Sequence, residues 1–480
     1  MPDTNLSARA PGLLDAIRDV VGPRGLLLDP TDTAPFAEDW RRLYRSHTPA
    51  VIRPANTAEV AAVIRLCAEA GVPVVPQGGN TSMVGGATPP LDGSALVLSL
   101  SRLNAVRGVD AVDLTMTLEA GVTLKSAQDA AAAAGCLLPL SISSEGSAQI
   151  GGVLATNAGG NNTLRYGNAR DLVLGLEVVL PDGAVWNGLR RLRKDNTGYC
   201  LRQLFVGAEG TLGVITAAVL KLAPQPRERV VAFCGVASPE AALDLLTRFQ
   251  RHDAAAIHAF EYMSDMGMGL VLRHIPGAVL PLTRRTPDYV LVELATPRPD
   301  AGLQGAMEAV LEGALADGVV LDAAIAGSEA QRRAIWKLRE EFSEAQKREG
   351  ASVKNDVSVP VSRVPELIRR AGAACAALIP GVRIVPFGHL GDGNIHFNLA
   401  QPEGADGAAF IAHDHAIMDT VNAVVRDLDG SFSAEHGVGQ LKPYMMPEWR
   451  GGAELALMQS IKHALDPHGI MNPGKVLPRE

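Results

Sequence analysis

Two glycine-dense segments constrain the fold of this chain more than any other feature. The first, QGGNTSMVGG at residues 77–86, follows the apolar run VPVVP, and the second spans residues 143–167. Glycine lets backbone N–H groups surround an anion, so two such loops favour a bound pyrophosphate, as in a dinucleotide. Either segment alone is better explained as a set of tight turns. Neither contains a P-loop or the G-x-G-x-x-G fingerprint, which argues against a Rossmann site.

Hydrophobic periodicity predicts an α+β chain. Helices are expected from about Pro11, at 56–70 with Asn56 or Thr57 as the cap, and at 123–135. Beyond the linker-like APQPRER, strands and helices alternate in a pattern typical of a second α+β domain with a mostly antiparallel sheet. The segment 328–350 is predicted to form one long helix, and 352–361 one strand.

The length of 480 residues indicates roughly three domains. The expected divisions are an N-terminal helical segment, a first large domain, a second large domain, and a C-terminal segment that returns to the first. Their boundaries are placed at 1–45, 46–224, 225–430 and 431–480.

The segment Pro386–Asn398, PFGHLGDGNIHFN, predicts a hairpin that gathers two histidines. With Asp392-Gly393 as a two-residue turn, His389 would face His396, and Asn398 would return to the same face. Leu390 and Ile395 would then point into the core. Two imidazoles in contact suit a divalent metal, but histidines bonded to solvent or backbone explain the segment about equally well.

Charge, hydropathy and cysteine spacing exclude several classes of protein. The net charge of −8 argues against nucleic-acid binding. The sequence has no run of eighteen apolar residues, so no membrane span is expected. The N-terminus lacks the features of a signal peptide, so a cytoplasmic location is expected. The five cysteines are scattered, which predicts reduced thiols and a metal bound through nitrogen and oxygen rather than sulfur.

Three long motifs resemble the flavin-binding domain of the vanillyl-alcohol-oxidase superfamily: PVVPQGGNTSMVGGATP, EGSAQIGGVLATNAGGNNTLRYGNARDLVLGLEVVLPDG and FVGAEGTLGVIT. With GHLGDGNIHFN, SAEHGVGQLK and MNPGK, the similarity covers almost the whole chain. It points to the FAD-linked D-2-hydroxyacid dehydrogenases of the D-lactate, glycolate and D-2-hydroxyglutarate types. The fold it implies is a vanillyl-alcohol-oxidase-type FAD-binding domain plus an α+β substrate (cap) domain with an antiparallel sheet.

The resemblance implies a set of FAD-binding residues. They are Pro76, Gly78, Gly79, Asn80, Thr81, Glu119, Ala120, Gly121, Ser143, Ser147, Ile150, Gly151, Gly152, Thr156, Asn157, Gly160, Tyr166, Gly167 and Ile215. Some relatives attach FAD covalently through a histidine of the first loop. This loop contains no histidine, so dissociable FAD is expected.

The resemblance also implies His389, His396 and Glu435 as ligands of a divalent metal, with Asn398 beside them as a substrate-binding residue. Zinc is the default for such ligands. His436, next to Glu435, is the expected general base for the substrate hydroxyl, with hydride leaving Cα for flavin N5.

Arg339, Ser343 and Lys354 resemble the distal-carboxylate site of the D-2-hydroxyglutarate branch. D-2-Hydroxyglutarate is therefore the expected substrate, with D-malate or D-lactate weaker. Alternatives are a D-lactate or glycolate dehydrogenase, a zinc hydrolase, and a non-catalytic subunit of an oxidising complex. A separate electron acceptor, either an electron-transfer flavoprotein or a quinone, is expected because no second redox motif is present. Resemblance alone suggests a homodimer.

Overall fold

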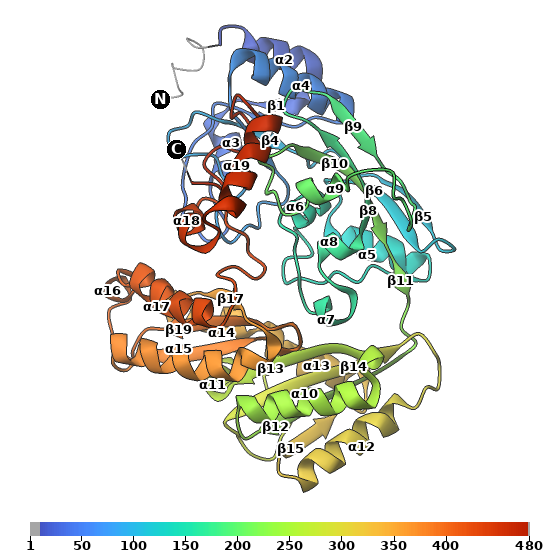
Figure 1. Ribbon diagram of the computed structural model, residues 1–480, viewed down its shortest axis with the longest axis vertical. Helices are drawn as coiled ribbons and strands as arrows, with labels where there is room; N and C mark the ends of the chain where they lie inside the picture. Colours follow the sequence, from blue (N-terminus) through green and yellow to red (C-terminus); the bar gives the residue numbers. More distant parts are fainter. Residues whose placement is uncertain (1–9, 479–480) are drawn as a thin grey trace. The chain divides into compact units, whose positions relative to one another are not determined.

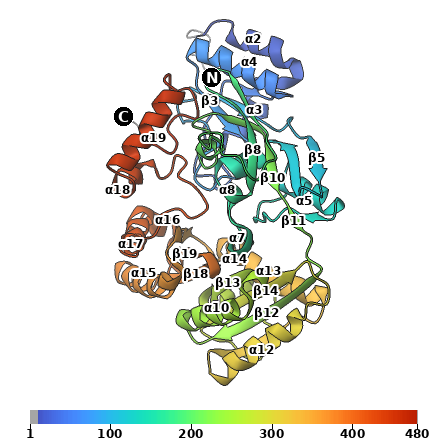
Figure 2. The ribbon, with the colours of Figure 1, turned by 45° about the vertical axis from the view of Figure 1, so that its right-hand side comes forward.

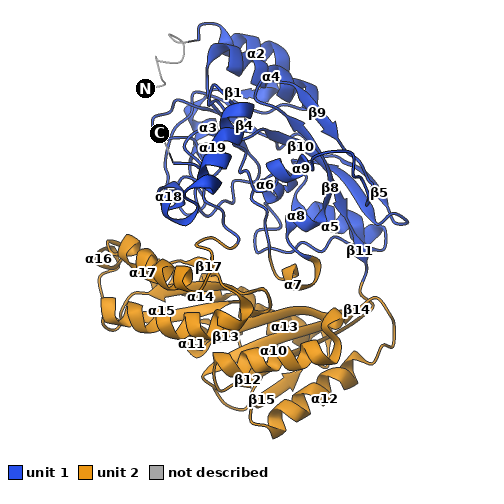
Figure 3. Cartoon of the chain, in the orientation of Figure 1, with its two compact units in different colours: residues 1–159, 167–225, 435–480 blue, residues 160–166, 226–434 orange. Residues whose placement is uncertain are grey.

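The computed structural model describes residues 10–478, which form two compact units (Figure 3). The first unit comprises residues up to 159, 167–225 and those from 435 on. The second unit comprises 160–166 and 226–434. Within the described residues no helix is long and apolar enough to cross a membrane.

The first unit contains a four-stranded and a five-stranded sheet (Figure 1). The four-stranded sheet has the order β1 (Leu26–Leu27), β2 (Val51–Ile52), β4 (Leu96–Ser99), β3 (Val74–Gln77). The five-stranded sheet is antiparallel, with the order β5 (Val106–Asp110), β6 (Thr115–Glu119), β10 (Val214–Lys221), β8 (Val173–Val179), β9 (Val185–Gly188). A separate pair is formed by β11 (Ala223–Pro224) and β7 (Cys136–Leu137).

The helices of the first unit connect and cover these sheets (Figure 2). They are α2 (Leu13–Val21), η1 (Pro23–Gly25), α3 (Pro30–Ala37), α4 (Thr57–Ala70), α5 (Leu124–Ala133), α6 (Ile150–Ala155), α8 (Ala169–Leu172), α9 (Arg202–Phe205), η5 (Pro443–Met445), α18 (Met446–Trp449) and α19 (Ala453–Leu465). Helix α4 confirms its prediction, because the Asn56 side chain accepts from the Glu59 amide and Gly71 ends the helix with φ of 62°.

The second unit is built on one eight-stranded sheet, which confirms the predicted α+β class with an antiparallel sheet. Its path is β15 (Val320–Ile325), β12 (Glu228–Val236), β14 (Asp288–Thr296), β13 (Ile257–Ser264), β18 (Arg383–His389), β19 (Asn394–Ala400), β16 (Ser352–Val353), with β17 (Asp356–Ser358) also paired to β19. The strand pairs are antiparallel throughout.

Helices cover both faces of this sheet. They are α7 (Thr163–Tyr166), α10 (Pro239–Asp253), η2 (Ala254–Ala256), α11 (Asp265–His274), α12 (Leu303–Ala316), α13 (Glu329–Glu340), α14 (Phe342–Glu349), η3 (Val361–Arg363), α15 (Val364–Leu378), η4 (Leu390–Asp392), α16 (Gly407–Ile411) and α17 (Asp414–Asp427). One core joins α11, α13 and α14 to the face that carries Phe233, Leu291 and Phe387. On the other face, Phe249 of α10 packs edge-on against Phe260 of β13.

The predicted single helix at 328–350 is wrong, because the chain turns at Glu341 (φ −83°, ψ 1°) between α13 and α14. Glu340 is the last residue of α13, where the negative end of the helix dipole disfavours a carboxylate, whereas Glu341 directly precedes α14, whose positive end favours one. Arg339 and Ser343 therefore belong to different helices.

The predicted strand at 352–361 is also interrupted, at Lys354 and Asn355, between β16 and β17. The side-chain amide of Asn355 donates to the Phe397 carbonyl oxygen at 2.9 Å, and the Asn355 carbonyl accepts from the Phe397 amide at 2.8 Å. Asn355 thus bonds to β19 partly through its side chain, which breaks the regular ladder.

Asp288, at the start of β14, is a buried carboxylate whose hydrogen-bond partner is the Tyr262 hydroxyl at 2.5 Å. Burial raises the pKa of Asp288 to about 6. An aspartate in the unfolded chain titrates near 3.9. The folded state therefore binds more protons between these values, and the stabilising contribution is lost as pH rises from about 4 to about 6.

We predict that Asp288→Asn raises the free energy of unfolding at pH 7 by on the order of 1–3 kcal/mol and flattens its dependence on pH between about 4 and 6. Asparagine keeps an oxygen for the Tyr262 hydroxyl. Urea unfolding at pH 4.5 and pH 7 measures the effect. Asp322→Asn is the control of opposite sign, because hydrogen bonds from Thr283 lower the pKa of Asp322. A less stable Asp288 variant at pH 7 would contradict the prediction.

Candidate functional site

The hairpin of β18 and β19 is present, but its predicted register is wrong. His389 pairs with Asn394, and Phe387 pairs with His396. The turn takes four residues instead of two, because Leu390–Asp392 form a 3₁₀ turn and Gly393 follows with φ of 84°. Leu390 and Ile395 are fully buried, as predicted, although Leu390 now belongs to the turn.

The register differs from the prediction by two residues, so every side chain keeps its predicted face. His389 and His396 are diagonal neighbours with ring centroids 5.9 Å apart. The Phe387 ring lies 5.0 Å from that of His396. The gathering of two imidazoles on one face, which was the basis of the metal prediction, is therefore retained through a different pairing.

Four side chains form the candidate metal centre: Asp356, His396, Glu435 and His436. Each offers one ligand atom, and these atoms lie within 4.8 Å of one another. Imidazole nitrogens and carboxylate oxygens suit zinc and other divalent first-row metals, so the donor set fits the metal that the sequence implied. His396 and Glu435 were predicted as ligands and His436 as a base, whereas Asp356 was not predicted to bind metal. His389 is outside this group of four, although its ring is next to that of His396.

Local structure fixes Asp356 in this position. It pairs with His396 across β17 and β19, and its Oδ1 accepts from the Asn394 side-chain amide at 3.0 Å. The Ala434 amide donates to the Asp356 carbonyl oxygen at 3.3 Å, and Glu435 is the next residue.

Arg339 and His389 share one buried carboxylate, Glu261 of β13. Glu261 Oε2 lies 2.8 Å from Arg339 Nε, and Oε1 lies 2.8 Å from His389 Nδ1. Burial alone would raise the pKa of Glu261, but the charges and hydrogen bonds of His389 and Arg339 outweigh it and lower the pKa. Sequence reasoning missed Glu261, because nothing in FEYMS distinguishes it from an ordinary strand residue.

The other predicted substrate residues lie in different environments. The amide of Asn398 is buried and bonded at both ends, to Gln346 Oε1 at 3.1 Å and from the Asn355 amide at 3.3 Å. Lys354 is half-buried, and Ser343 is exposed on α14.

The two glycine-rich segments pack directly on each other in the first unit. A β-carbon at Gly79 would lie 1.9 Å from the Ser147 carbonyl oxygen, and one at Gly151 would lie 2.8 Å from the Ala120 β-carbon. Only glycine permits the first of these approaches. Among the described residues, the backbone N–H groups of Gly79, Asn80 and Thr81 have no hydrogen-bond acceptor. They are therefore available to an anion.

Two further observations support a ligand at these loops. Asn80 has φ of 53°, a left-handed conformation typical of backbone nests that bind anions. Gln149 Oε1 is buried and has no partner among the described residues. The residues predicted for FAD fit such a cradle, and all lie in the first unit except Gly160 and Tyr166, which belong to the second.

Among the predicted FAD residues, Glu119 and Asn157 use their side chains within the protein. The side chains of Asn80 and Thr156 do so too, by donating to the Glu38 and Gly152 carbonyl oxygens. The Glu119 carboxylate accepts from the Ala105 amide at 3.0 Å and pairs with Arg107 at 3.2 Å. Asn157 Oδ1 accepts from the Arg170 amide at 2.9 Å. These two residues shape the loops, so any contact they make with a ligand would come mainly from their backbone.

The segment that carries Glu435 and His436 is held by Glu209. The Glu209 carboxylate accepts from the amides of Val438 at 2.7 Å and Gly439 at 2.8 Å. Burial raises the pKa of Glu209, although these two amides oppose the shift. In the sequence, Glu209 stands out only as the acidic residue of the apolar, glycine-rich FVGAEGTLG, and sequence analysis assigned it no role.

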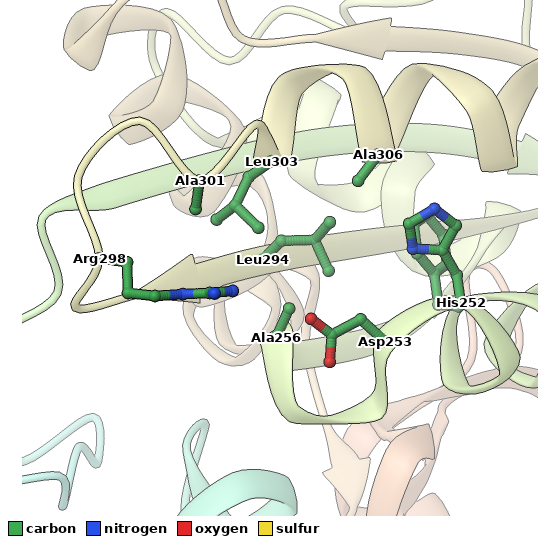
Figure 4. A pocket seen from close by; sticks show the side chains of 9 residues that line it. His252, Asp253, Ala256, Leu294, Arg298, Ala301, Leu303 and Ala306 are labelled. Atoms are coloured by element: carbon green, nitrogen blue, oxygen red, sulfur yellow. The ribbon is translucent and has the colours of Figure 1, made fainter.

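The second unit also has a pocket between the C-terminal end of α10 and the N-terminal end of α12 (Figure 4). Its lining includes His252, Asp253 and Arg298 but none of the predicted site residues. The Glu228 carboxylate already accepts from the amides of Ala301 and Leu303 at the start of α12. This pocket is therefore a poor anion site.

The chain matches two protein families. Residues 48–188 match the FAD binding domain family, and residues 225–476 match the family described as FAD linked oxidases, C-terminal domain.

Curated relatives span nearly the whole chain. A D-2-hydroxyglutarate dehydrogenase of Xanthomonas citri pv. viticola is 36% identical over 96% of this chain and 96% of its own length. The mitochondrial D-2-hydroxyglutarate dehydrogenase of Bos taurus is 39% identical over 97% of this chain and 83% of its own length. Among solved structures, p-cresol methylhydroxylase with substrate bound has a TM-score of 0.78 at 16% identity, covering 100% of this chain and 99% of that chain, which shows the shared fold.

We predict that Glu209→Ala exposes the amides of Val438 and Gly439, because each loses its buried acceptor. An unsatisfied buried N–H costs about 1–3 kcal/mol, so amide exchange in residues 435–440 should accelerate by about 10–100-fold. Hydrogen–deuterium exchange with mass spectrometry measures this.

The matched control is Glu177→Ala, since Glu177 is equally buried in the first unit but accepts from Thr57 and Thr216. Both variants should lose stability, but only the Glu209 variant should show the local change. Unchanged exchange in residues 435–440 would contradict the prediction.

Proposed function

The chain belongs to the FAD-linked D-2-hydroxyacid dehydrogenases, and on this premise we propose that it oxidises D-2-hydroxyglutarate to 2-oxoglutarate. The observation that carries the proposal is the near full-length similarity to a bacterial and a mammalian D-2-hydroxyglutarate dehydrogenase. Neither family match supports the alternative of a zinc hydrolase. D-Lactate or glycolate dehydrogenation remains the second candidate.

We propose that FAD binds without a covalent bond. The first glycine-rich loop offers unpaired amides and Asn80 in a left-handed conformation, which suit the pyrophosphate. Some relatives carry a histidine in the first loop, but residues 77–86 contain none. The side-chain amide of Gln77, at the start of the loop, donates to the Phe36 and Ala87 carbonyl oxygens. The loop therefore offers no histidine that could bond to the flavin, so acid precipitation should release the cofactor.

The metal centre and its neighbours would organise the reaction. His396 and Glu435 would hold a divalent metal, probed first as zinc, and Asp356 is a further candidate ligand. His389, whose ring centroid lies 5.9 Å from that of His396, would complete the predicted ligand set. A metal held there would lower the pKa of the substrate hydroxyl, and FAD would supply the hydride acceptor through N5. His436 would take the hydroxyl proton, as a general base next to the ligand Glu435.

Selection among 2-hydroxyacids would depend on the second carboxylate. Arg339, Ser343 and Lys354 would pair with it, and Asn398 would support them through its bonds to Gln346 and Asn355. A monocarboxylate such as D-lactate has no second carboxylate to offer these side chains, so it would gain less binding energy than D-2-hydroxyglutarate.

The remaining features of the proposal concern the electron acceptor, the oligomeric state, the cellular location and the domain boundaries. Electrons would leave to a separate acceptor, an electron-transfer flavoprotein or a quinone, and the chain would form a homodimer. The cytoplasmic location stays a prediction, since the bovine relative is named as mitochondrial. The domain boundaries at 45, 224 and 430 likewise stay predictions.

We predict that D-2-hydroxyglutarate bleaches the flavin of the purified protein under anaerobic conditions faster than D-malate, D-lactate or L-2-hydroxyglutarate. Lys354→Met should raise the KM for D-2-hydroxyglutarate by about 10–100-fold, the loss of one charge-assisted hydrogen bond, and leave that for D-lactate nearly unchanged. Lys347→Met on exposed α14 is the control. A wild type that prefers D-lactate would refute the substrate assignment.

Removal of the metal should abolish turnover and leave FAD bound. The reason is that the glycine-rich cradle shares no residue with the candidate metal centre. Dialysis against a chelator, followed by a flavin absorbance scan and an activity assay with and without added zinc, tests this. Flavin lost in step with the metal would show that the two sites are not independent.

A further inference from the structure

We infer that Glu261 is a positioning residue that orients both a metal-binding histidine and the substrate-binding arginine. This inference rests on the proposed function and goes beyond it. Glu261 is 1% exposed and lies on β13 next to β18. The pairing of Tyr262 with Gly388 places Glu261 across from His389 on the same face. One carboxylate therefore touches both groups, through Oε1 and Oε2 separately.

The contact with His389 determines which ring nitrogen carries the proton. A carboxylate that accepts from Nδ1 keeps the proton on that nitrogen and leaves the lone pair on Nε2. Glu261 Oε1 is 2.8 Å from His389 Nδ1, so Nε2 is the atom that would face a metal. Without the carboxylate, the ring could take the other tautomer or rotate.

The contact with Arg339 orients its guanidinium group. Only Nε is bonded to Glu261, and the Cζ atom lies 5.0 Å from the centre of the Phe387 ring. Among the described residues, neither Nη1 nor Nη2 of Arg339 has an acceptor. The two terminal groups are thus free for the bidentate recognition of a carboxylate, for which the planar guanidinium is suited.

Glu261 also supplies the charge that both partners require. Arg339 is 7% exposed, and a buried cation without a partner is strongly unfavourable. The shared carboxylate compensates this charge through Nε and leaves the outer edge of the guanidinium open. The same anion makes His389 a stronger ligand, because it polarises the Nδ1–H bond.

The fold provides a matched control in Glu293 of β14. It is also 1% exposed and also bonds to α13, accepting from Trp336 Nε1 at 2.7 Å and from Arg229 Nη1 at 2.7 Å. No predicted site residue contacts it through these bonds. Glu293→Gln therefore reproduces the loss of a buried carboxylate on this sheet without disturbing His389 or Arg339.

The test uses full-length, FAD-loaded protein with Glu261→Gln, Glu261→Asp and Glu293→Gln. Glutamine has nearly the shape of glutamate but only one acceptor oxygen, so one of the two donors loses its partner. Zinc affinity is measured by competition with a chromophoric chelator, without substrate. Glu261→Gln should bind zinc about 10–100-fold more weakly, the range for loss of a residue that orients a ligand. Its KM for D-2-hydroxyglutarate should rise more than that for D-lactate.

Glu261→Asp keeps the negative charge, so it should recover part of the zinc affinity and part of the preference for D-2-hydroxyglutarate. It also replaces the glutamine variant in the test if that variant does not fold. Glu293→Gln should keep zinc affinity and the KM ratio of the wild type. The inference would be overturned if Glu261→Gln kept the zinc affinity and KM ratio of the wild type. It would also be overturned if Glu293→Gln lost as much zinc affinity and selectivity as Glu261→Gln, or if the wild type bound no zinc. A different outcome is that the wild type fails to oxidise D-2-hydroxyglutarate while its zinc affinity still falls in Glu261→Gln and not in Glu293→Gln. That result would refute the proposed substrate and support the positioning of His389.

Discussion

The packing of the second unit depends on hydrogen bonds and ion pairs that compensate the charges of its buried carboxylates. Glu261 and Glu293 are on adjacent strands of one sheet face, each 1% exposed, and helix α13 covers them. Arg339 and Trp336 of that helix each donate to one of them. Two uncompensated charges at these depths would make the packing of α13 on the sheet unfavourable. The helix is therefore positioned by specific polar contacts as well as by apolar contacts.

Much of the fold followed from local pattern. The cap at Asn56, the glycine at 71 and the apolar stripe between them specify α4, because each acts within a few residues. The antiparallel sheet was predictable for the same reason, from short apolar runs separated by turns. The turn at Glu341 was missed because no glycine or proline marks the junction of α13 and α14. The break at Asn355 was missed because it involves a side chain that bonds to another strand.

The candidate site was predictable only where its residues are close in sequence. The hairpin carries His389 and His396 on one face, and alternation alone was enough to find that. Asp356, Glu261 and Glu209 come from distant segments, and each acts through contacts made only after folding. An isolated acidic residue in a strand or glycine-rich turn has no periodicity that distinguishes a structural from a functional role.

The register of the β18–β19 hairpin has an evolutionary consequence. The side chains of a strand alternate with period two, so a turn can gain or lose two residues and still present both histidines on the same face. Loss or gain of a single residue would instead turn one imidazole toward the opposite side of the sheet. Insertions and deletions in this turn should therefore be tolerated in pairs among homologous chains, and single ones should be accompanied by a bulge that restores the alternation.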